Sequence, residues 1–394
     1  MEYVVRNNCE IKNYGLAADY GVKKAKVVKG FHGTIPGYKP TPLVCLEHLA
    51  ETLGISKLYV KDESKRFTEN AFKVLGGSFA LAMYLSKLIN PDCEKPYALD
   101  YLKKAKEEGI LPELTFITTT DGNHGRGVAW ASRELGHKCV VYMPKGTALE
   151  RLNNILALGA DASITDLSYD DAVRLATENA RKNGWVLVQD TSFENYEDIP
   201  KTIMQGYTTF ALEITEQLNG VIPTHVFLQA GVGSMAGAIT GFLADFYREN
   251  CPKIVIVEPL KADCIYKTAK ADDGRLHFYT DTMDTMMAGL ACGEPCELGW
   301  KQLNNFAYAF FSVEEDVTVK GMQRLGRPVG DDERIISGES GAVTTGLVIE
   351  LMTNPDLEDV RKDLQLDEES VVVCISTEGA TDSKNYERIL KLAE

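Results

Sequence analysis

The middle of the chain alternates short apolar runs with longer amphipathic stretches, and this alternation restricts the fold more than any other feature. The apolar runs are typical of buried strands, and the stretches between them are long enough for helices that end at Gly or Asn-Gly. Strands are expected at residues 114–119, 139–143, 162–165 and 186–189, and helices at 125–135, 148–158 and 168–182. This β-α-β-α-β-α-β order predicts a parallel sheet with right-handed crossovers.

A second set of strands lies on both sides of this segment. These strands are expected at residues 58–61, 224–229, 254–257 and 371–375, and a further helix begins after Asn70. The chain is therefore predicted to be an α/β protein with two open, parallel-type sheets. A small substrate-side domain, residues 76–190, is inserted in a larger domain made of residues 1–75 and 191–394. A length of 394 residues is typical of two domains.

Composition and charge exclude several classes of protein. The chain has 42 basic and 57 acidic residues, a net charge of −15, which disfavours nucleic acid as a partner. Nine cysteines spread thinly over the chain favour a reducing compartment, and the N-terminal residues do not resemble a secretory signal, so a cytoplasmic location is expected. Residues 226–244 carry no charge, but their glycines favour a strand, a turn and a buried helix over a membrane span.

The cysteines leave one question open. Only Cys292 and Cys296 lie close in sequence, and no histidine-rich segment accompanies them, so no metal site is expected. A disulfide between Cys292 and either Cys264 or Cys296 is compatible with the sequence.

A glycine-rich loop lies between an expected strand and an expected helix. Its residues are Gly231, Val232, Gly233, Ser234, Met235, Ala236 and Gly237. Free backbone N–H groups at such a helix start bind phosphate. With Glu258 at the end of the next strand, the loop also fits a dinucleotide fingerprint, so the sequence also allows a nicotinamide-dependent oxidoreductase.

Other polar residues follow the ends of expected strands. Asp121, Asp190 and the pair Ser376 and Thr377 all occupy such positions. In open parallel sheets, ligands bind beyond the carboxyl ends of the strands. These residues are therefore predicted to gather at one binding site.

Lys73 is a candidate for covalent chemistry. It lies at the start of an expected helix, next to Phe72, Val74 and Leu75. Both the positive end of the helix and apolar surroundings lower the pKa of a lysine. A lysine in this setting is a candidate Schiff-base former.

The segment around Lys73, Asn-Ala-Phe-Lys-Val-Leu-Gly-Gly, resembles the lysine motif of the fold-type II pyridoxal-phosphate enzymes, the tryptophan synthase β family, whose usual form is Ser-Phe-Lys. Residues 119–124 resemble the substrate loop of that family, residues 231–237 its phosphate loop, and residues 375–377 its terminal strand. The resemblance covers nearly the whole chain in the right order.

This resemblance implies a cofactor and its ligands. Pyridoxal 5′-phosphate would be attached to Lys73, with Asn123 at its ring O3′. The backbone of Gly231, Val232, Gly233, Ser234 and Met235 would bind the phosphate, and Ser376 or Thr377 would offer a hydroxyl to the pyridine nitrogen.

Finer motifs resemble one branch of the family, which releases ammonia from 2,3-diaminopropionate. They occupy residues 61–66, 121–130, 188–190, 229–233, 288–295, 337–342 and 376–379. The resemblance implies a carbon–nitrogen lyase of amino-acid catabolism that converts D- or L-diaminopropionate to pyruvate and two ammonia. It also implies a homodimer.

Asp121 separates this chain from the serine and threonine dehydratases of the same family, which have serine there. An aspartate attracts an ammonium and repels a carboxylate. Thr119, Thr120, Asp121 and Asp190 are the expected substrate-binding residues. For removal of the Cα proton we expect Asp190 to serve the L form and Asp121 the D form, with Lys73 as a competing base. The sequence also allows a serine or threonine dehydratase, and a non-catalytic protein on the same fold.

Overall fold

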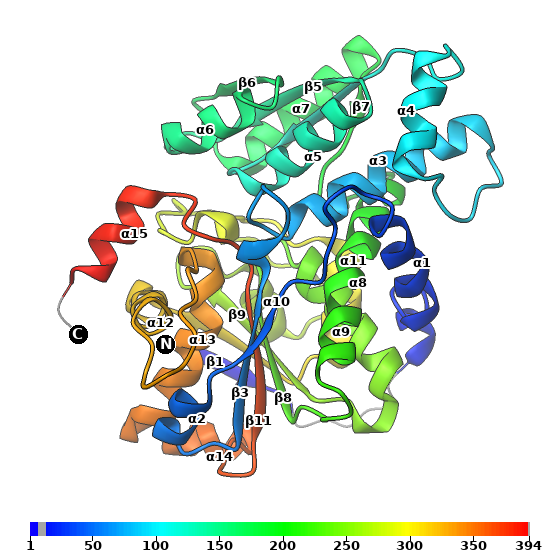
Figure 1. The fold of residues 1–394 in the computed structure, drawn as a ribbon. Coiled ribbons are helices and arrows are strands. Elements are labelled where there is room, and N and C mark those ends of the chain that lie inside the picture. The colour runs from blue at the N-terminus through cyan, green and yellow to red at the C-terminus, as the bar shows by residue number, and fades with distance from the viewer. Residues whose placement is uncertain (7–12, 393–394) are drawn as a thin grey trace.

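In the computed structural model, which describes residues 1–6 and 13–392, the strands form two separate sheets (Figure 1). The larger sheet has the order β1 (Glu2–Val5), β10 (Ala309–Val313), β9 (Lys253–Pro259), β8 (His225–Gln229), β11 (Val371–Ser376), β3 (Lys57–Asp62) and β2 (Leu43–Cys45). The smaller sheet has the order β6 (Asp161–Ile164), β5 (Lys138–Met143), β4 (Thr115–Thr119) and β7 (Val186–Leu187).

Both sheets are parallel except at the edges of the larger one. There β1 pairs antiparallel with β10 and β2 pairs antiparallel with β3. The prediction of two parallel-type sheets is therefore confirmed. Strands β1, β2 and β10 were not expected from the sequence, and the two short edge strands depend on pairing with distant residues.

Side chains on the two faces of the small sheet alternate, as strand geometry requires. Phe116 and Val141 belong to the core that includes α5 (Asn123–Glu134), whereas Ile117 and Val140 pack against α7 (Tyr169–Asn183). Helix α7 begins where the sequence predicts. The Ser168 hydroxyl accepts a hydrogen bond from the backbone N–H of Asp171, and the helix ends at Gly184 with φ +67°.

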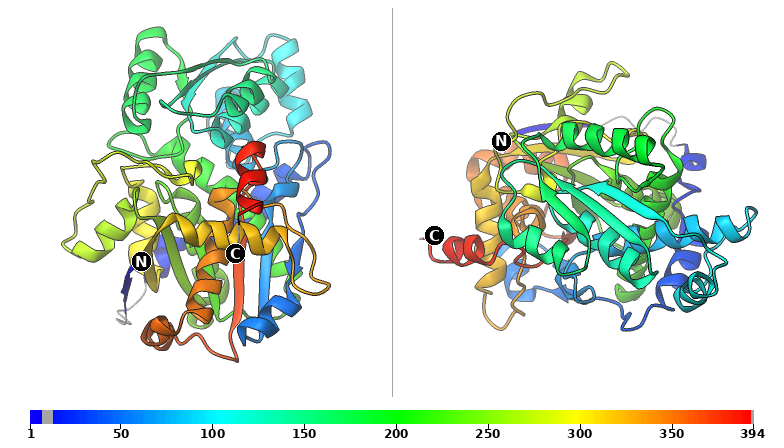
Figure 2. Two further views of the ribbon diagram at one scale, coloured as in Figure 1. Left: turned by 90° about the vertical axis from the view of Figure 1, so that its left-hand side faces the viewer. Right: turned by 90° about the horizontal axis from the view of Figure 1, so that it is seen from above.

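Helices cover both faces of the larger sheet (Figures 1 and 2). On one face lie α1 (Val22–His32), α8 (Asp198–Gln217), α9 (Ser234–Tyr247) and α11 (Glu297–Phe306). On the other lie α2 (Glu47–Leu53), α12 (Glu315–Gly326), α13 (Glu339–Thr353) and α14 (Glu358–Leu364), with α15 (Ser383–Leu390) against α12. The remaining helices are α3 (Lys73–Ile89), α4 (Leu99–Glu107), α6 (Leu149–Leu156), α10 (Cys264–Ala271) and the short 3-10 turns η1 (Tyr14–Ala17), η2 (Glu63–Lys65), η3 (Arg248–Asn250), η4 (Ala288–Leu290) and η5 (Pro355–Leu357).

Helix α3 joins the two parts of the molecule, because it packs on α8 below and on α5 above (Figure 1). Its contact with α5 requires glycine on both helices. A Cβ atom on Gly77 would lie 3.0 Å from the carbonyl carbon of Gly127, and one on Gly127 would lie 2.9 Å from the Cα atom of Val74. The domain boundary that we propose at residues 75 and 76 falls in the first turn of α3.

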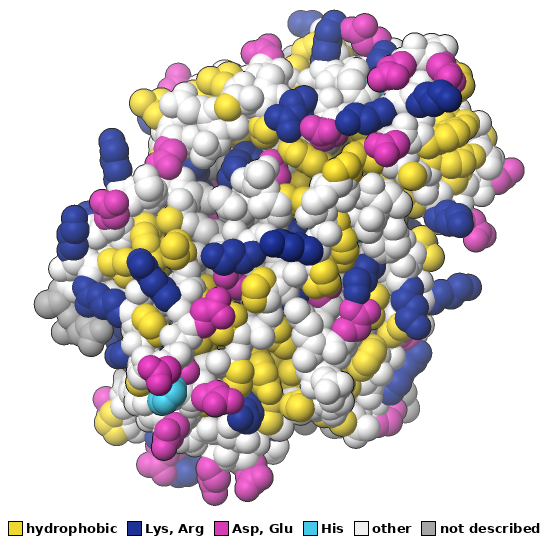
Figure 3. All heavy atoms as spheres, in the orientation of Figure 1, with side chains coloured by type: hydrophobic (Ala, Val, Ile, Leu, Met, Phe, Trp, Pro, Cys, Tyr) yellow, Lys and Arg dark blue, Asp and Glu magenta, His cyan; other side chains and the backbone are white. Residues whose placement is uncertain are grey.

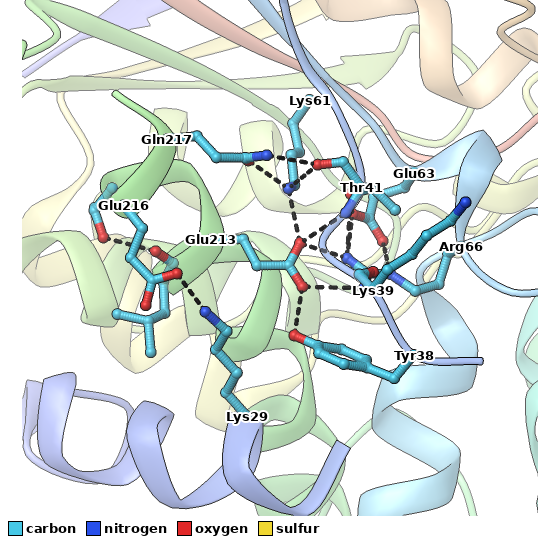
Figure 4. A network of polar contacts seen from close by, with 12 residues as sticks. Lys29, Tyr38, Lys39, Thr41, Lys61, Glu63, Arg66, Glu213, Glu216 and Gln217 are labelled. Carbon is cyan, nitrogen blue, oxygen red and sulfur yellow. Dashed lines mark hydrogen bonds and ion pairs between the residues drawn. The ribbon is translucent and has the colours of Figure 1, made fainter. Parts of the chain in front are cut away.

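A buried network of four charges holds the segment that precedes α3 (Figure 4). Glu213 on α8 binds the Nζ atom of Lys61 at 2.7 Å and both terminal nitrogens of Arg66, at 2.7 and 3.0 Å. Arg66 also binds Glu63, and the Tyr38 hydroxyl donates to Glu213. Burial alone would raise the pKa of Glu213, but the two cations lower it to about 2. Two cations and two anions thus compensate each other inside the protein.

On the molecular surface, acidic and basic side chains are interspersed on the face shown in Figure 3. Residues 226–244 form β8, the glycine turn and most of α9, which agrees with the prediction from their glycines. Within residues 1–6 and 13–392, no helix has the length and apolar character needed to span a membrane.

Candidate active site

A cavity lies between the two sheets, at the carboxyl ends of β4, β8 and β11. This is the edge at which parallel α/β sheets bind ligands. The residues that line it come from both parts of the molecule: Phe72, Lys73, Thr120, Asp121, Asn123, His124, Tyr169, Asp190, Gln229, Ala230, Gly231, Val232, Gly233, Ser234, Met235, Ala236, Gly289, Leu290, Cys292, Ser340, Thr377 and Glu378.

Lys73 is the first residue of α3, and its ammonium group pairs with the Asp190 carboxylate. Burial alone would lower the pKa of Lys73, as the sequence suggested, but Asp190 raises it well above the usual range. The expected lowered pKa is therefore wrong for the protein without a ligand. The sequence could not reveal this, because Asp190 is 117 positions away.

Asp190 is held by several neighbours. Its Oδ1 atom accepts a hydrogen bond of 3.3 Å from the Tyr169 hydroxyl and one of 3.4 Å from Gln189. The Nδ1 atom of His124 lies 3.8 Å from Oδ2. Burial raises the pKa of Asp190, but His124 and Lys73 outweigh it and lower the pKa to about 2. Asp190 is therefore a carboxylate at all ordinary pH values.

Asp121 lies in the turn between β4 and α5 and has a different environment. Its Oδ2 atom accepts a hydrogen bond of 3.1 Å from Arg151 on α6. Burial raises the pKa of Asp121 to about 6, with Arg151 opposing this rise and Glu378 adding to it. The two aspartates that the sequence singled out thus line one cavity with very different proton affinities.

The glycine loop has the conformation that a phosphate site needs. Gly233, with φ +90°, precedes the first turn of α9. The backbone N–H groups of Val232 through Ala236 donate no hydrogen bond to any residue in the described part of the chain. A Cβ atom on Gly231 would lie 3.1 Å from the Cα atom of Leu290, so the loop packs closely against the backbone at Leu290. These free donors at a helix N-terminus can bind an anion.

Ser376 and Thr377 lie at the end of β11, but only Thr377 lines the cavity. The Ser376 hydroxyl donates to Ser337 at 2.8 Å. The Thr377 hydroxyl accepts from Gln229, whose Nε2 atom also donates to the carbonyl of Ile375. Of the two residues left open by the sequence, Thr377 is thus the one at the cavity.

Thr119 and Thr120 also differ. Thr119 is fully buried and does not line the cavity, and its hydroxyl donates a hydrogen bond to the carbonyl of Ala172. The Thr119 side chain therefore points away from the cavity, because alternate strand residues point to opposite faces, and its contact with a substrate stays a prediction. Thr120 lines the cavity, and its hydroxyl accepts the backbone N–H of Gly122.

Asn123 starts helix α5 and donates a hydrogen bond from its Nδ2 atom to the Glu378 carboxylate.

Glu258 has a different role from the one that a dinucleotide fingerprint implies. Its carboxylate accepts the backbone N–H groups of Ile265 and Tyr266, at 2.9 and 2.6 Å, and so caps α10. It is absent from the cavity wall, which argues against a nicotinamide dinucleotide.

The candidate disulfides are not formed. Cys264, Cys292 and Cys296 are free thiols, and Cys292 lines the cavity. Cys9 lies outside the described residues. Among the residues that the structure describes, no three His, Cys, Asp or Glu side chains are placed to hold a metal ion.

Sequence reasoning missed several residues of the cavity. Tyr169 lines the cavity from the start of α7 and Cys292 lines it from a loop, while Arg151, near the start of α6, pairs with Asp121 from outside the wall. Gln229 ends one expected strand and Glu378 follows another, so their positions in the sequence alone suggested that they lie at the binding edge of the sheet. Cys292 lies in a loop, where no strand or helix boundary in the sequence indicated its position.

Comparison with known proteins identifies the class. The family of pyridoxal-phosphate-dependent enzymes matches residues 34–378, and the chain belongs to this family. Within the family, it is 49% identical over 373 residues to diaminopropionate ammonia-lyase from Escherichia coli, covering 94% of this chain and 92% of that enzyme. The Salmonella typhimurium diaminopropionate ammonia-lyase is 47% identical over 391 residues, covering 97% and 96%.

Solved structures give the same picture. The crystal structure of the holo form of the Escherichia coli diaminopropionate ammonia-lyase has a TM-score of 0.91 and 46% identity, covering 99% of this chain and 96% of that one. A structure of that enzyme in complex with D-serine is equally similar. The expected branch of fold-type II enzymes is thus confirmed, and the nicotinamide-dependent hypothesis is wrong.

The cavity fits pyridoxal 5′-phosphate, the cofactor of this family. Lys73 is available for covalent attachment, the glycine loop has unpaired N–H donors, and Thr377 carries a hydroxyl at the wall. The buried Gln229 Oε1 and Glu378 Oε1 atoms have no hydrogen-bond partner among residues 1–6 and 13–392, which is expected where a ligand completes the site.

Proposed function

We propose that this enzyme catalyses the α,β-elimination of 2,3-diaminopropionate. The products are pyruvate and two ammonia, with one water consumed. The observation that carries the proposal is Asp121, a partly buried carboxylate in the substrate loop of a pyridoxal-phosphate-dependent enzyme. Similarity to two diaminopropionate ammonia-lyases along almost the entire chain supports it.

The residues of this chain have distinct roles in the proposed reaction. Lys73 holds the cofactor, and bound pyridoxal phosphate supplies an electron sink for the charge that develops at the substrate Cα. Backbone N–H groups of residues 231–235 hold the phosphate. Asn123 would contact the ring oxygen of the bound cofactor, and the Thr377 hydroxyl would hydrogen-bond to its ring nitrogen. A neutral hydroxyl there makes a weaker electron sink than a carboxylate, which favours elimination over transamination.

Proton transfer is assigned to the two aspartates. Asp190 removes the Cα proton of the L form and Asp121 that of the D form, since these protons point to opposite faces of a fixed substrate. The β-nitrogen leaves as ammonia only if it carries a proton, because an amide anion is a poor leaving group. The released 2-aminoacrylate then hydrolyses in water to pyruvate and the second ammonia.

Serine or threonine dehydration is the second candidate, because L-threonine dehydratase from Mycobacterium leprae is 26% identical over 375 residues. The acidic side chains of the cavity favour the ammonia-lyase reaction, since an ammonium–carboxylate hydrogen bond contributes about 1.5–3 kcal/mol. This corresponds to about a tenfold to more than hundredfold preference. A substrate panel with pyruvate detection tests the proposal. Equal kcat/KM for serine and diaminopropionate would favour the dehydratase.

Three properties extend the proposal beyond the reaction itself. The enzyme acts in amino-acid catabolism, works in the cytoplasm and forms a homodimer. The resemblance to fold-type II enzymes and the thin spread of cysteines support these statements. Light scattering of the purified protein tests the dimer.

A further inference from the structure

We infer that Glu378 is a specificity-determining residue that binds the β-ammonium group of the substrate. This inference rests on the proposed function and assigns to it a residue whose role the fold-level resemblance leaves open. Four features of the structure carry it: the rigid position of Glu378, a carboxylate oxygen without a donor, the absence of a close cation, and the surplus of negative charge in the cavity.

The backbone of Glu378 is held on two sides. It pairs with Ala71, two residues before Lys73, and its carbonyl accepts the N–H of Gly338 at 3.0 Å. The next residue, Gly379, donates its N–H to the carbonyl of Asn70 at 3.0 Å. The side chain of Glu378 thus starts from a fixed point beside the lysine and lines the cavity.

One oxygen of the carboxylate is satisfied and the other is not. The Oε2 atom accepts hydrogen bonds from Asn123 and, at 3.3 Å, from Thr381. The Oε1 atom is buried and has no hydrogen-bond partner among the residues that the structure describes. Since Glu378 is only 1% exposed, water from bulk solvent does not reach it freely. A buried acceptor without a donor is costly, so a ligand that brings a donor gains from binding here.

The other two carboxylates of the cavity already have cations. Asp190 pairs with Lys73, and Asp121 pairs with Arg151. Within the described residues, Glu378 has no Lys, Arg or His nitrogen within the 4.0 Å limit of an ion pair, although Arg126 and Arg151 interact with it at longer range. Glu378 is therefore the one of these three carboxylates that forms no ion pair with a residue in the described part of the chain.

The charges at the cavity explain why a diamine would be preferred. Three carboxylates line the wall, and their ion-pair partners are Lys73 in the wall and Arg151 outside it, so the carboxylates outnumber these two cations by one. Diaminopropionate brings an ammonium on its β carbon, whereas serine brings a neutral hydroxyl. A carboxylate near this nitrogen also favours its protonated form, which is the form that can leave as ammonia.

The test compares Glu378→Gln with Glu339→Gln in the holoenzyme. Glu339 is a matched control because it is a buried glutamate at the start of α13 that binds Asn385 and does not line the cavity. For E378Q, kcat/KM on diaminopropionate should fall about 10- to 100-fold, as expected for loss of a charge-assisted hydrogen bond, while kcat/KM on D-serine should change less than about threefold. E339Q should leave the ratio of the kcat/KM values on the two substrates unchanged.

Equilibrium binding supplies a readout independent of turnover. β-Alanine carries the carboxylate and the β-ammonium but lacks the α-amino group, and 3-hydroxypropionate replaces the ammonium by a hydroxyl. In calorimetric titrations, E378Q should weaken β-alanine binding about tenfold and leave 3-hydroxypropionate binding unchanged. Glu378→Asp shortens the side chain by one methylene group and so withdraws the carboxylate from the substrate. This variant should also lower the ratio of kcat/KM on diaminopropionate to kcat/KM on D-serine, and it provides a test even if E378Q fails to fold.

Equal losses on both substrates would overturn the inference, because Glu378 would then act only by orienting Asn123. An unchanged ratio in both Glu378 variants would also overturn it. Failure of the proposed function has a different signature, since the wild-type enzyme would then prefer serine to diaminopropionate.

Discussion

The two aspartates of the cavity should give the two enantiomers of diaminopropionate different pH profiles. A general base works only when deprotonated. Asp121, with a pKa of about 6, is about 90% deprotonated at pH 7 and about 9% at pH 5. Asp190, with a pKa of about 2, stays more than about 99% deprotonated over this range. Between pH 7 and pH 5, kcat/KM should fall about tenfold for the D form and remain nearly constant for the L form.

The assay is pyruvate formation from each enantiomer on one enzyme preparation at several pH values. Activity on the L form is the internal control, because acid damage to the protein would reduce both activities. Asp121→Asn should lower activity on the D form about 10²–10⁴-fold and abolish the fall of that activity between pH 7 and pH 5. Asp190→Asn should lower activity on the L form by a similar factor. Because Asp190→Asn leaves buried Lys73 without its counter-ion, unfolding of that variant is measured in parallel. Parallel pH profiles and equal losses on both enantiomers would refute the assignment of one base to each form.

Three further outcomes follow from the structure. Lys73→Ala should abolish steady turnover and covalent cofactor attachment while it retains the fold, and borohydride reduction followed by mass spectrometry should add mass at Lys73 in the wild type alone. Gly233→Ala should destabilise the protein by about 1–2 kcal/mol and weaken phosphate binding, because residue 233 has φ +90° and its new Cβ would lie 3.0 Å from Ile265; thermal unfolding with and without cofactor measures both. Glu213→Gln should cost about 3–5 kcal/mol in urea unfolding, because Arg66 would remain buried with a weakened partner, and wild-type stability in this variant would contradict that account.

The local sequence determined most of the secondary structure that supports the site. Apolar runs with the lengths of buried strands predicted β3, β4, β5, β6, β8, β9 and β11. Ser168 and Gly184 predicted both ends of α7, because capping depends on residues adjacent in the chain. The glycine loop was predicted for the same reason, since a positive φ at residue 233 and free N–H groups at a helix start are local properties.

The sequence also indicated which residues would share the cavity. Lys73, Asp121, Asn123 and Asp190 each lie at a strand end or a helix start, and parallel strands bring these points to one edge. The sequence did not reveal that the Thr119 side chain points away from the cavity, because which face of a strand lines a cavity depends on the neighbouring strands. Resemblance to a known family supplied the cofactor, which no spacing could identify alone.

Only the tertiary structure decided the electrostatics of the site. The pKa of Lys73 depends on Asp190, and the pKa of Asp121 depends on Arg151 and Glu378. These partners lie between 30 and more than 250 positions apart, and the energy of a charge depends on distance and burial rather than on order in the chain. For this reason the sequence predicted two aspartates at one site but not their protonation. The tertiary structure keeps Asp190 ionised at ordinary pH and raises the pKa of Asp121 to about 6.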